Sequence, residues 1–519
     1  MNKKNTINKS LLKQYSIPSS NFHPYGTNSG KIDPVFNSKK KAKHILVTAI
    51  NPTSAGEGKT TCAICIADAL NTLNKKTILC LRQPSIGPTL GMKGGATGNG
   101  KSEVIPSQLI NYGLNGDFFI IETIHNLIAS IIENNIYFGS ALNIDPNKIL
   151  WNRVIDLNDR GLRDIQIKIK KDLYYHSSFD ITPASEIMAI FCLSKNIKDF
   201  KDRVNNIVVA YNKKNKPVRV KDFKLNNQID YLIEKLFQPN VVKTKENTLT
   251  LMHGGPFANI AHGCNSLVAL QTADHYAKTV ITEAGFGADL GCEKYIDIIS
   301  SLYAQPDVIV FVITLKAVIN HAKTNKDIKK QIDDGLRLVS QHIKTIKNYG
   351  YDPIVVINQF KDDNLNQLKY LEQQIQNKFK VNVFKIDPVN QGKKSATALA
   401  KYLAKLPLVK KVKRIYQLNE PLDIKIQKIV NNVYGLKTKV KYAKLAASKL
   451  KTYKNLPYYV CMAKTPYSMS SDQTKVIFNE NDEVLISDFV IAHGAQFVIP
   501  ITGTIFRMPG LPKVPNVQK

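Results

Sequence analysis

Short apolar runs rich in Val, Ile and Leu recur along the chain, and between them apolar residues return at helical spacing. The runs cover residues 45–50, 77–81, 206–210, 248–252, 279–282, 308–313, 354–357 and 381–386. Strands that alternate with amphipathic helices are typical of βαβ units, in which neighbouring strands run parallel. The pattern therefore predicts an α/β protein built on a mostly parallel sheet.

The longest apolar stretch, residues 308–319, is preceded by Asp307 and interrupted by Lys316. A helix that crosses a bilayer needs about 20 consecutive apolar residues. The stretch is too short for that, so we interpret it as a buried strand leading into a helix and expect no membrane association.

The first of these predicted strands leads into a short loop of small residues that ends in Gly58, Lys59 and Thr60, and a helical apolar pattern follows. Small residues let backbone N–H groups surround a phosphate at a helix N-terminus. A lysine adds charge on the β- and γ-phosphates, and a threonine hydroxyl binds Mg²⁺. Thr53 stands where the usual motif has glycine. The segment nevertheless indicates a phosphate-binding loop between a strand and a helix.

With 519 residues the chain is longer than a single core usually supports. We predict an N-terminal arm over residues 1–43 and two or three domains in the chain as a whole. The net charge of +31 has two interpretations, an anionic partner or a lysine-rich solvated surface. The lysines are spread along the chain, which favours the second interpretation, and we expect no nucleic-acid partner.

The seven cysteines are odd in number and scattered, and the first residues lack the apolar segment of an export signal. This usage is typical of free thiols in a reducing compartment, so we expect a cytoplasmic protein. Cys62 and Cys65 have C-x-x-C spacing without a second pair at zinc-ribbon spacing, and we interpret them as small buried side chains.

Several glycine-rich segments also follow predicted strands. Arg82 ends one strand and precedes Ser85 and the glycine-rich residues 91–100, while residues 253–266 and 282–291 place His, Asn, Glu and Asp among glycines. Ligands of parallel sheets bind at the carboxyl ends of strands. An arginine there is suited to hold a carboxylate or an acyl phosphate through two hydrogen bonds.

These motifs resemble those of the formate–tetrahydrofolate ligases, also called formyltetrahydrofolate synthetases. The matching stretches include PTSAGEGKTT (52–61), RQPSIGP (82–88), ASEIMA (184–189), the segments 253–266 and 282–291, VCMAKTPYS (460–468) and MPGLPKVP (508–515). The resemblance implies ATP-dependent ligation of formate to tetrahydrofolate through formyl phosphate, giving 10-formyltetrahydrofolate. It also implies a P-loop NTPase-like, nucleotide-binding core with an insertion over residues 44–375 and smaller C-terminal α/β domains over 376–519. Mg²⁺, a monovalent cation (K⁺ or NH₄⁺) and a homotetramer are implied as well.

The resemblance also assigns residues to the site. It implies that ATP binds to the loop formed by Thr53, Ser54, Ala55, Gly56, Glu57, Gly58, Lys59 and Thr60. Lys59 and Arg82 are the implied catalytic residues, with Lys59 on the γ-phosphate and Arg82 on formyl phosphate. Thr60 is the implied ligand of Mg²⁺, and Ser85, Gly94 and Gly95 line the adjoining pocket.

The chain departs from the family pattern mainly on the side where the resemblance places the folate. Gln83 replaces a glutamate, and Val389 aligns near an aromatic residue that is expected to stack on the pterin. The stack is missing if Val389 occupies that position, and Phe360 and Tyr295 are the aromatic residues that would supply it if the alignment is wrong. These departures support an alternative interpretation, a fold relative that binds ATP but has altered or lost ligase activity.

Overall fold

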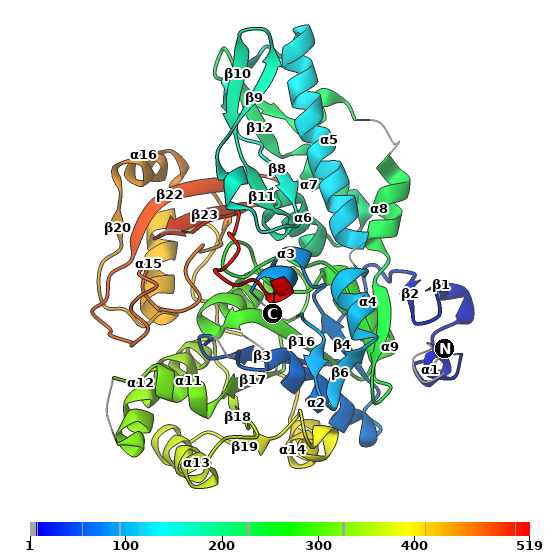
Figure 1. Ribbon diagram of the computed structural model, residues 1–519, viewed down its shortest axis with the longest axis vertical. Helices are drawn as coiled ribbons and strands as arrows, with labels where there is room; N and C mark the ends of the chain where they lie inside the picture. Colours follow the sequence, from blue (N-terminus) through cyan, green and yellow to red (C-terminus); the bar gives the residue numbers. More distant parts are fainter. Residues whose placement is uncertain are drawn as a thin grey trace.

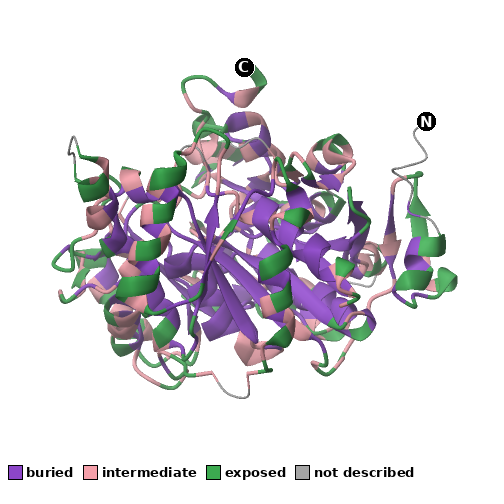
Figure 2. Cartoon of the chain, turned by 90° about the horizontal axis from the view of Figure 1, so that it is seen from below, coloured by how far each residue is buried: buried purple, intermediate pink, exposed green. Residues whose placement is uncertain are grey.

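The computed structural model describes residues 7, 9–53, 56–92, 95–114, 116–225, 229–323, 327–409, 412–503 and 505–518. Its centre is a twelve-stranded mixed sheet covered by helices (Figures 1 and 2). In spatial order the sheet contains β1 (Phe22–Tyr25), β2 (Ser29–Ile32), β14 (Asn240–Thr244), β15 (Leu249–Met252), β4 (Thr77–Leu81), β16 (Thr279–Gly287), β3 (Lys43–Ala49), β17 (Val308–Ile313), β18 (Ile354–Asn358) and β19 (Val383–Ile386). β6 (Ser102–Ile105) joins it through β14, and β5 (Gly98–Asn99) pairs with β6.

The strands from β15 to β19 in this order all run parallel. In the central register Ile45 of β3 lies between Ile281 of β16 and Val308 of β17. Strands that are buried on both faces read as continuous apolar runs, which is why the sequence pattern located them. The predicted α/β fold with a mostly parallel sheet is confirmed.

Alternate residues of the central strands face two different cores. Ile45 and Val47 pack with α2 (Lys59–Thr72), α4 (Ser107–Tyr112) and α14 (Thr397–Lys405), whereas Leu46 packs in the core that includes α9 (Leu267–Tyr276), α11 (Leu315–Asn320), α12 (Ile328–Asn348) and α13 (Leu365–Phe379). The short helix α3 (Ile86–Gly91) follows β4, and the short helix α10 (Ser300–Leu302) precedes β17. Figure 2 shows the resulting layers, with buried strands between helices whose outer faces are exposed.

A second body is inserted between β6 and β14 and lies at the top of Figure 1. It contains α5 (Gly116–Phe138), α6 (Glu186–Leu193), α7 (Ile197–Asn205), α8 (Asp230–Phe237), β7 (Ile144–Ile149), β8 (Arg153–Ile155), β9 (Ile165–Lys170), β10 (Leu173–Ser177), β11 (Phe179–Ile181), β12 (Val208–Asn212) and β13 (Pro217–Arg219). The run at 206–210 forms most of β12, but its assignment to the parallel sheet was wrong. β12 pairs antiparallel with β7 and β13, because a short turn after β12 returns the chain beside it.

The two ends of the chain pack on this frame. The N-terminal segment contains α1 (Lys9–Gln14), and β2 pairs antiparallel with β14, so this segment extends the main sheet. The C-terminal part contains α15 (Leu422–Asn432), α16 (Lys444–Tyr453) and a sheet in the order β20 (Lys441–Tyr442), β22 (Leu485–Ala492), β23 (Phe497–Thr502) and β21 (Tyr459–Val460). β19 continues the main sheet beyond residue 375. The domain boundaries themselves remain a prediction.

Candidate active site

The predicted phosphate loop connects the carboxyl end of β3 to the N-terminus of α2. Gly56 and Gly58 have φ angles of 72° and 66°, in the left-handed region that favours glycine. A Cβ on Gly58 would collide with the side-chain amide of Asn358, which donates to the Glu57 carbonyl at 3.1 Å. Ser54 and Ala55 lie outside the described residues. The described part of the loop is therefore held against β18 through the side chain of Asn358.

Glu57 organises the same loop through its carboxylate. Its Oε1 accepts hydrogen bonds from the backbone N–H and the hydroxyl of Thr53, both at 2.9 Å. Its Oε2 accepts from the Thr314 hydroxyl at 2.6 Å. The side chain is 6% exposed, and hydrogen bonds to charged groups are among the stronger ones in proteins. The resemblance placed Glu57 in the ATP loop, and the structure adds that its carboxylate closes that loop.

Lys59 and Thr60 open α2, and their side chains reach β16, the parallel neighbour of β3. Lys59 Nζ donates to the Phe286 carbonyl at 3.0 Å, and Thr60 Oγ1 donates to Glu283 Oε2 at 2.8 Å. The Glu283 side chain is buried, with 5% of the residue exposed. A hydroxyl beside a carboxylate offers the oxygen ligands that Mg²⁺ prefers when phosphate oxygens and water complete its shell. Glu283 was absent from the predicted site, although its TEAGFGADLG motif was the available signal.

In the described part of the chain, no group of three or more His, Cys, Asp or Glu side chains is arranged to hold a metal ion. Mg²⁺ is usually bound by one or two protein side chains together with substrate phosphates. The Thr60 and Glu283 pair fits that kind of site, in which the nucleotide supplies most of the ligands.

Arg82 follows β4, on the other side of β16, and its guanidinium stands near the same carboxylate. Nη1 donates to the Pro256 carbonyl at 2.9 Å, and Nη2 lies 3.9 Å from Glu283 Oε1. Nε is buried and has no hydrogen-bond partner among the described residues. Gly285 leaves room for the group, because a Cβ there would lie 3.0 Å from Nη1. The guanidinium thus retains donor capacity for an oxyanion, as bidentate recognition requires.

The glycine segments 253–266 and 282–291 meet beside Arg82. Gly285 N donates to the Gly263 carbonyl at 3.0 Å, and a Cβ on Gly263 would collide with Ala258. The chain then passes through the π-helical turns η7 (Ala288–Cys292) and η8 (Tyr295–Ile299), a geometry often found at functional sites. The structure therefore brings both segments to the edge of the sheet that carries Lys59 and Arg82.

His262 lies within the first of these segments and is fully buried. Burial, together with the positive charges of Lys294 and Arg82, lowers its pKa to about 3. Lys294, also buried, donates to the carbonyls of Ala258 and Met462. His262 is therefore a neutral imidazole at pH 7, and the positive charge of this region comes from lysine and arginine.

Ser85 is buried at the start of α3, and its hydroxyl is hydrogen-bonded to Asp156 Oδ1. Asp156 Oδ2 accepts from the Ile86 N–H at 2.8 Å. Burial raises the pKa of Asp156 to about 7, although both hydrogen bonds act in the opposite direction. Ser85 thus follows Arg82 closely, but its hydroxyl is engaged by the inserted body.

The loop around Gly95 is held by α4. Gly95 has a φ of 82°, and the Ala96 N–H donates to Asn111 Oδ1 at 3.0 Å. Gly94 lies outside the described residues. The hydrogen bonds of this loop in the described residues connect it to α4 rather than to Lys59 or Arg82, so its place in the pocket remains a prediction.

Gln83, the residue that replaces a glutamate, is 3% exposed. Its backbone N–H donates to the Gly254 carbonyl at 2.7 Å. Neither atom of its side-chain amide has a hydrogen-bond partner among the described residues. Buried polar atoms are normally paired, so this amide is available to a ligand or a water molecule.

Val389 and the two aromatic candidates for the pterin stack lie in different surroundings. Tyr295 is 1% exposed inside the core, so its ring is covered by the protein itself. Phe360 is half-buried and has Lys316 Nζ 4.9 Å from its ring centroid. Val389 is half-buried, and its carbonyl accepts from the Lys101 N–H at 3.0 Å. Of the two aromatic candidates only Phe360 is partly exposed, and Val389 has no ring to stack, so the stacking residue remains a prediction.

The C-terminal motif at 460–468 reaches the phosphate loop, which the sequence reasoning did not anticipate. Asn51, just before the loop, donates through Nδ2 to the Pro466 carbonyl at 2.7 Å. Lys464 forms a buried ion pair with Asp289 at 2.7 Å. The motif had been matched without a role, and the structure shows that it anchors the C-terminal part beside the site.

The parallel sheet, the glycine loop and the lysine and threonine at the start of α2 are those of an α/β protein with a P-loop-type phosphate site. The family model described as "Formate--tetrahydrofolate ligase" matches residues 1–519. The chain belongs to this family of ATP-dependent ligases.

Curated relatives agree with this membership. The formate–tetrahydrofolate ligase of Malacoplasma penetrans (strain HF-2) is 44% identical over 491 residues, which cover 93% of this chain and 92% of the relative. The protein of the same name from Staphylococcus aureus (strain COL) is 40% identical over 522 residues, or 98% and 94% of the two chains. Nothing in these similarities favours the alternative of an ATP-binding relative without ligase activity. Within the described residues, no helix has the length and apolar character needed to cross a bilayer.

Proposed function

We propose that this chain ligates formate to tetrahydrofolate at the site formed by Lys59, Thr60, Arg82 and Glu283. The observation that carries the proposal is the meeting of Thr60 and Arg82, from either side of β16, at one carboxylate, Glu283. In the first step a formate oxygen attacks the γ-phosphorus of ATP, and ADP leaves. In the second step N10 of tetrahydrofolate attacks the formyl carbon, and inorganic phosphate leaves.

The positive groups neutralise the charge that develops on the phosphoryl oxygens. Lys59, held beside the loop by the Phe286 carbonyl, faces the γ-phosphate, and the remaining donors of Arg82 hold formyl phosphate. Preorganised charges of this kind supply much of the catalysis in phosphoryl transfer. The glycine segments that surround Arg82 keep water from a mixed anhydride that water would hydrolyse.

Two cations belong to the proposal. Thr60 and Glu283 would hold Mg²⁺, which neutralises phosphate charge when bound. The family resemblance adds K⁺ or NH₄⁺. The amide oxygen of buried Gln83, which has no hydrogen-bond partner among the described residues, can coordinate K⁺ or accept a hydrogen bond from NH₄⁺. Activity in KCl compared with LiCl at equal ionic strength tests the second cation.

We further propose a homotetramer located in the cytoplasm. Large apolar side chains are exposed on α5, where Phe119 is 64% and Phe138 76% exposed, and such groups are typical of surfaces that pack against another subunit. All seven cysteines are buried and free, which fits a reducing compartment. Analytical ultracentrifugation tests the assembly.

The experiment that tests the activity is formate-dependent phosphate release, measured with and without tetrahydrofolate. Lys59→Ala should abolish release while leaving thermal unfolding unchanged, because it removes the charge facing the γ-phosphate. Lys401→Ala, at an exposed lysine of α14, is the control and should retain full activity. Equal activity of a folded Lys59→Ala protein would show that the phosphate-loop assignment is wrong.

A further inference from the structure

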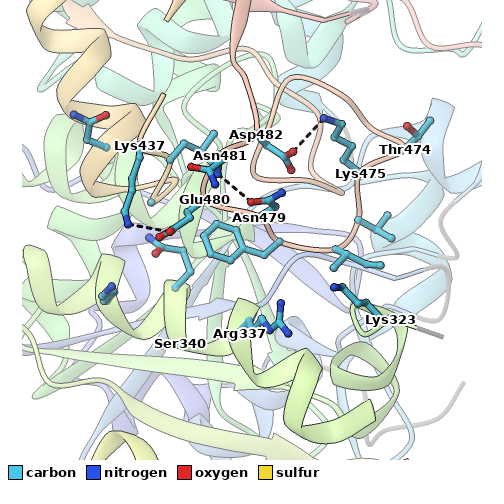
Figure 3. Close-up of a pocket in the computed structure, with 18 of the residues that line it drawn as sticks. Lys323, Arg337, Ser340, Lys437, Thr474, Lys475, Asn479, Glu480, Asn481 and Asp482 are labelled. Carbon is cyan, nitrogen blue, oxygen red and sulfur yellow. Dashed lines mark hydrogen bonds and ion pairs between the residues drawn. The ribbon is translucent and has the colours of Figure 1, made fainter. Parts of the chain in front are cut away.

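A cavity of about 1150 Å³ lies outside the site described above, between α12, the segment after α15 and the loop 474–482 (Figure 3). Its volume is slightly above the usual range of small-molecule sites, which runs from about 300 to 1,000 Å³. In Figure 3, Lys323 and Arg337 lie on one side of the cavity, and Lys475 and Asp482 of the loop 474–482 lie on the other. The cavity is therefore large enough for a ligand that contacts both sides.

The charged side chains that line the cavity are predominantly basic. Five are lysine or arginine and two are acidic. Lys437 pairs with Glu480 at 2.9 Å, and Lys475 pairs with Asp482 at 3.1 Å. These two pairs use both acidic groups of the lining, so the remaining basic residues give it an excess of positive charge.

Two of the remaining basic residues are lysines without a counter-ion. The ammonium groups of Lys323 and Lys344 form no ion pair with any described residue, and both residues are exposed. Arg337 is held by Asp334 at 2.8 Å, on the same helix as Lys344. Like charges on one wall repel each other, so an anion that binds between them is stabilised by both.

The opposite wall of the cavity is connected to the phosphate loop. Val476, which lines the cavity, accepts a hydrogen bond from His321 Nδ1 at 2.8 Å, and His321 Nε2 lies 3.3 Å from the Asn51 carbonyl oxygen. His342, a buried residue of α12 that lies behind the lining residues of that helix, hydrogen-bonds to Asn51 Oδ1 at 2.8 Å. Each wall of the cavity is therefore linked to Asn51, just before the phosphate loop, through a buried histidine behind it.

We propose that this cavity binds a small polyanion, a molecule with several carboxylate or phosphate groups, and that its occupancy changes the affinity of the phosphate loop for nucleotide. The unpaired lysines supply the recognition, and the contacts to Asn51 supply the coupling. The binding part of the proposal does not depend on the ligase reaction, because it concerns a separate cavity.

The test is calorimetric titration of the full chain with citrate and with tripolyphosphate. Saturating ADP and a fixed concentration of free Mg²⁺ keep the phosphate loop filled, so that neither probe binds there. We expect one saturable site, and the stronger probe identifies carboxylate or phosphate as the preferred group.

The test variant is Lys323→Glu/Lys344→Glu, and the matched control is Lys444→Glu/Lys451→Glu, which reverses two exposed lysines of α16. We expect the test variant to weaken binding by about tenfold or more and the control by less than about threefold, because Coulomb energy falls with distance and salt screens it. Lys323→Ala/Lys344→Ala, which only removes the charges, should lie between the wild type and the charge reversal.

The coupling is measured as the affinity for ADP with and without the stronger probe. Binding energies are reciprocal, so the affinity should change by about threefold or more in the wild type and stay constant in the Lys323→Glu/Lys344→Glu protein. Absence of saturable binding, or equal weakening in test and control variants, would overturn the site and identify general attraction to a protein of charge +31. Saturable binding without a change in ADP affinity would overturn the coupling.

Discussion

Glu57 offers the sharpest test of how the phosphate loop is built. Its carboxylate accepts two hydrogen bonds from Thr53 and one from Thr314. Hydrogen bonds to charged groups contribute about 1.5–3 kcal/mol each, and neighbouring bonds do not add fully. We therefore expect Glu57→Ala to release the loop, which would then have to be ordered again each time nucleotide binds.

The expected fall in ADP affinity follows from the loss of these hydrogen bonds. If about 2–4 kcal/mol of loop ordering is transferred to the binding step, the affinity for ADP should fall by about 30- to 1,000-fold. Glu57→Gln keeps an acceptor at Oε1 for both Thr53 donors, and its amide can donate to the Thr314 hydroxyl. This conservative variant should lose less than about tenfold, since it loses only the charge. Thr53→Val removes one of the three bonds and should fall between the wild type and Glu57→Ala.

The assay is calorimetric ADP binding with thermal unfolding measured on the same samples. Unfolding should shift little, because the loop bonds lie at the edge of the sheet rather than in its core. The reasoning is refuted if a folded Glu57→Ala protein binds ADP within about threefold of the wild type. It is refuted equally if Glu57→Gln is as weak as Glu57→Ala, because the acceptor geometry would then be irrelevant.

Three other predictions concern single residues. Arg82→Lys keeps the charge but removes the planar guanidinium, so formate-dependent phosphate release should fall by about 10²-fold, and a change below about threefold would mean that Arg82 serves only as a structural partner. Burial raises the pKa of Asp68 from 3.8 to about 7. Between these pH values the folded chain keeps a proton on this carboxyl that the unfolded chain loses. The free energy of unfolding therefore falls as the pH rises from about 4 to about 7. Asp68→Asn should therefore have a higher melting temperature than the wild type at pH 8 but not at pH 4. The exposed control Asp202→Asn should follow the wild type at both pH values. Parallel curves of melting temperature against pH for Asp68→Asn and the wild type would contradict the prediction. Val389→Trp should strengthen tetrahydrofolate binding by about 10- to 100-fold if it restores a stacking contact of about 1–3 kcal/mol, and the affinity for ATP should stay unchanged. If calorimetry shows no gain, Phe360 becomes the candidate for the residue that stacks on the pterin.

The sequence by itself determined the elements of the parallel sheet and the phosphate loop. β4 and β17 have the predicted limits, 77–81 and 308–313, because a strand buried on both faces must be apolar throughout. The loop was recognisable because phosphate binding demands small residues, a lysine and a hydroxyl within a few positions of one another. Both requirements concern residues that are neighbours in the chain, so the sequence alone is enough to recognise them.

The tertiary structure decided what surrounds that loop. Glu283 contacts Thr60, and Pro466 contacts Asn51, although the residues of each pair are more than 200 positions apart in the chain. They meet because of the order of the strands in the sheet and the way the C-terminal part packs beside it. The same holds for β12, whose apolar run was indistinguishable from those of the main sheet until its antiparallel partners were known. A strand's composition reports burial, whereas its neighbours depend on how distant segments pack, so the pairings at this site could not be read from adjacent residues.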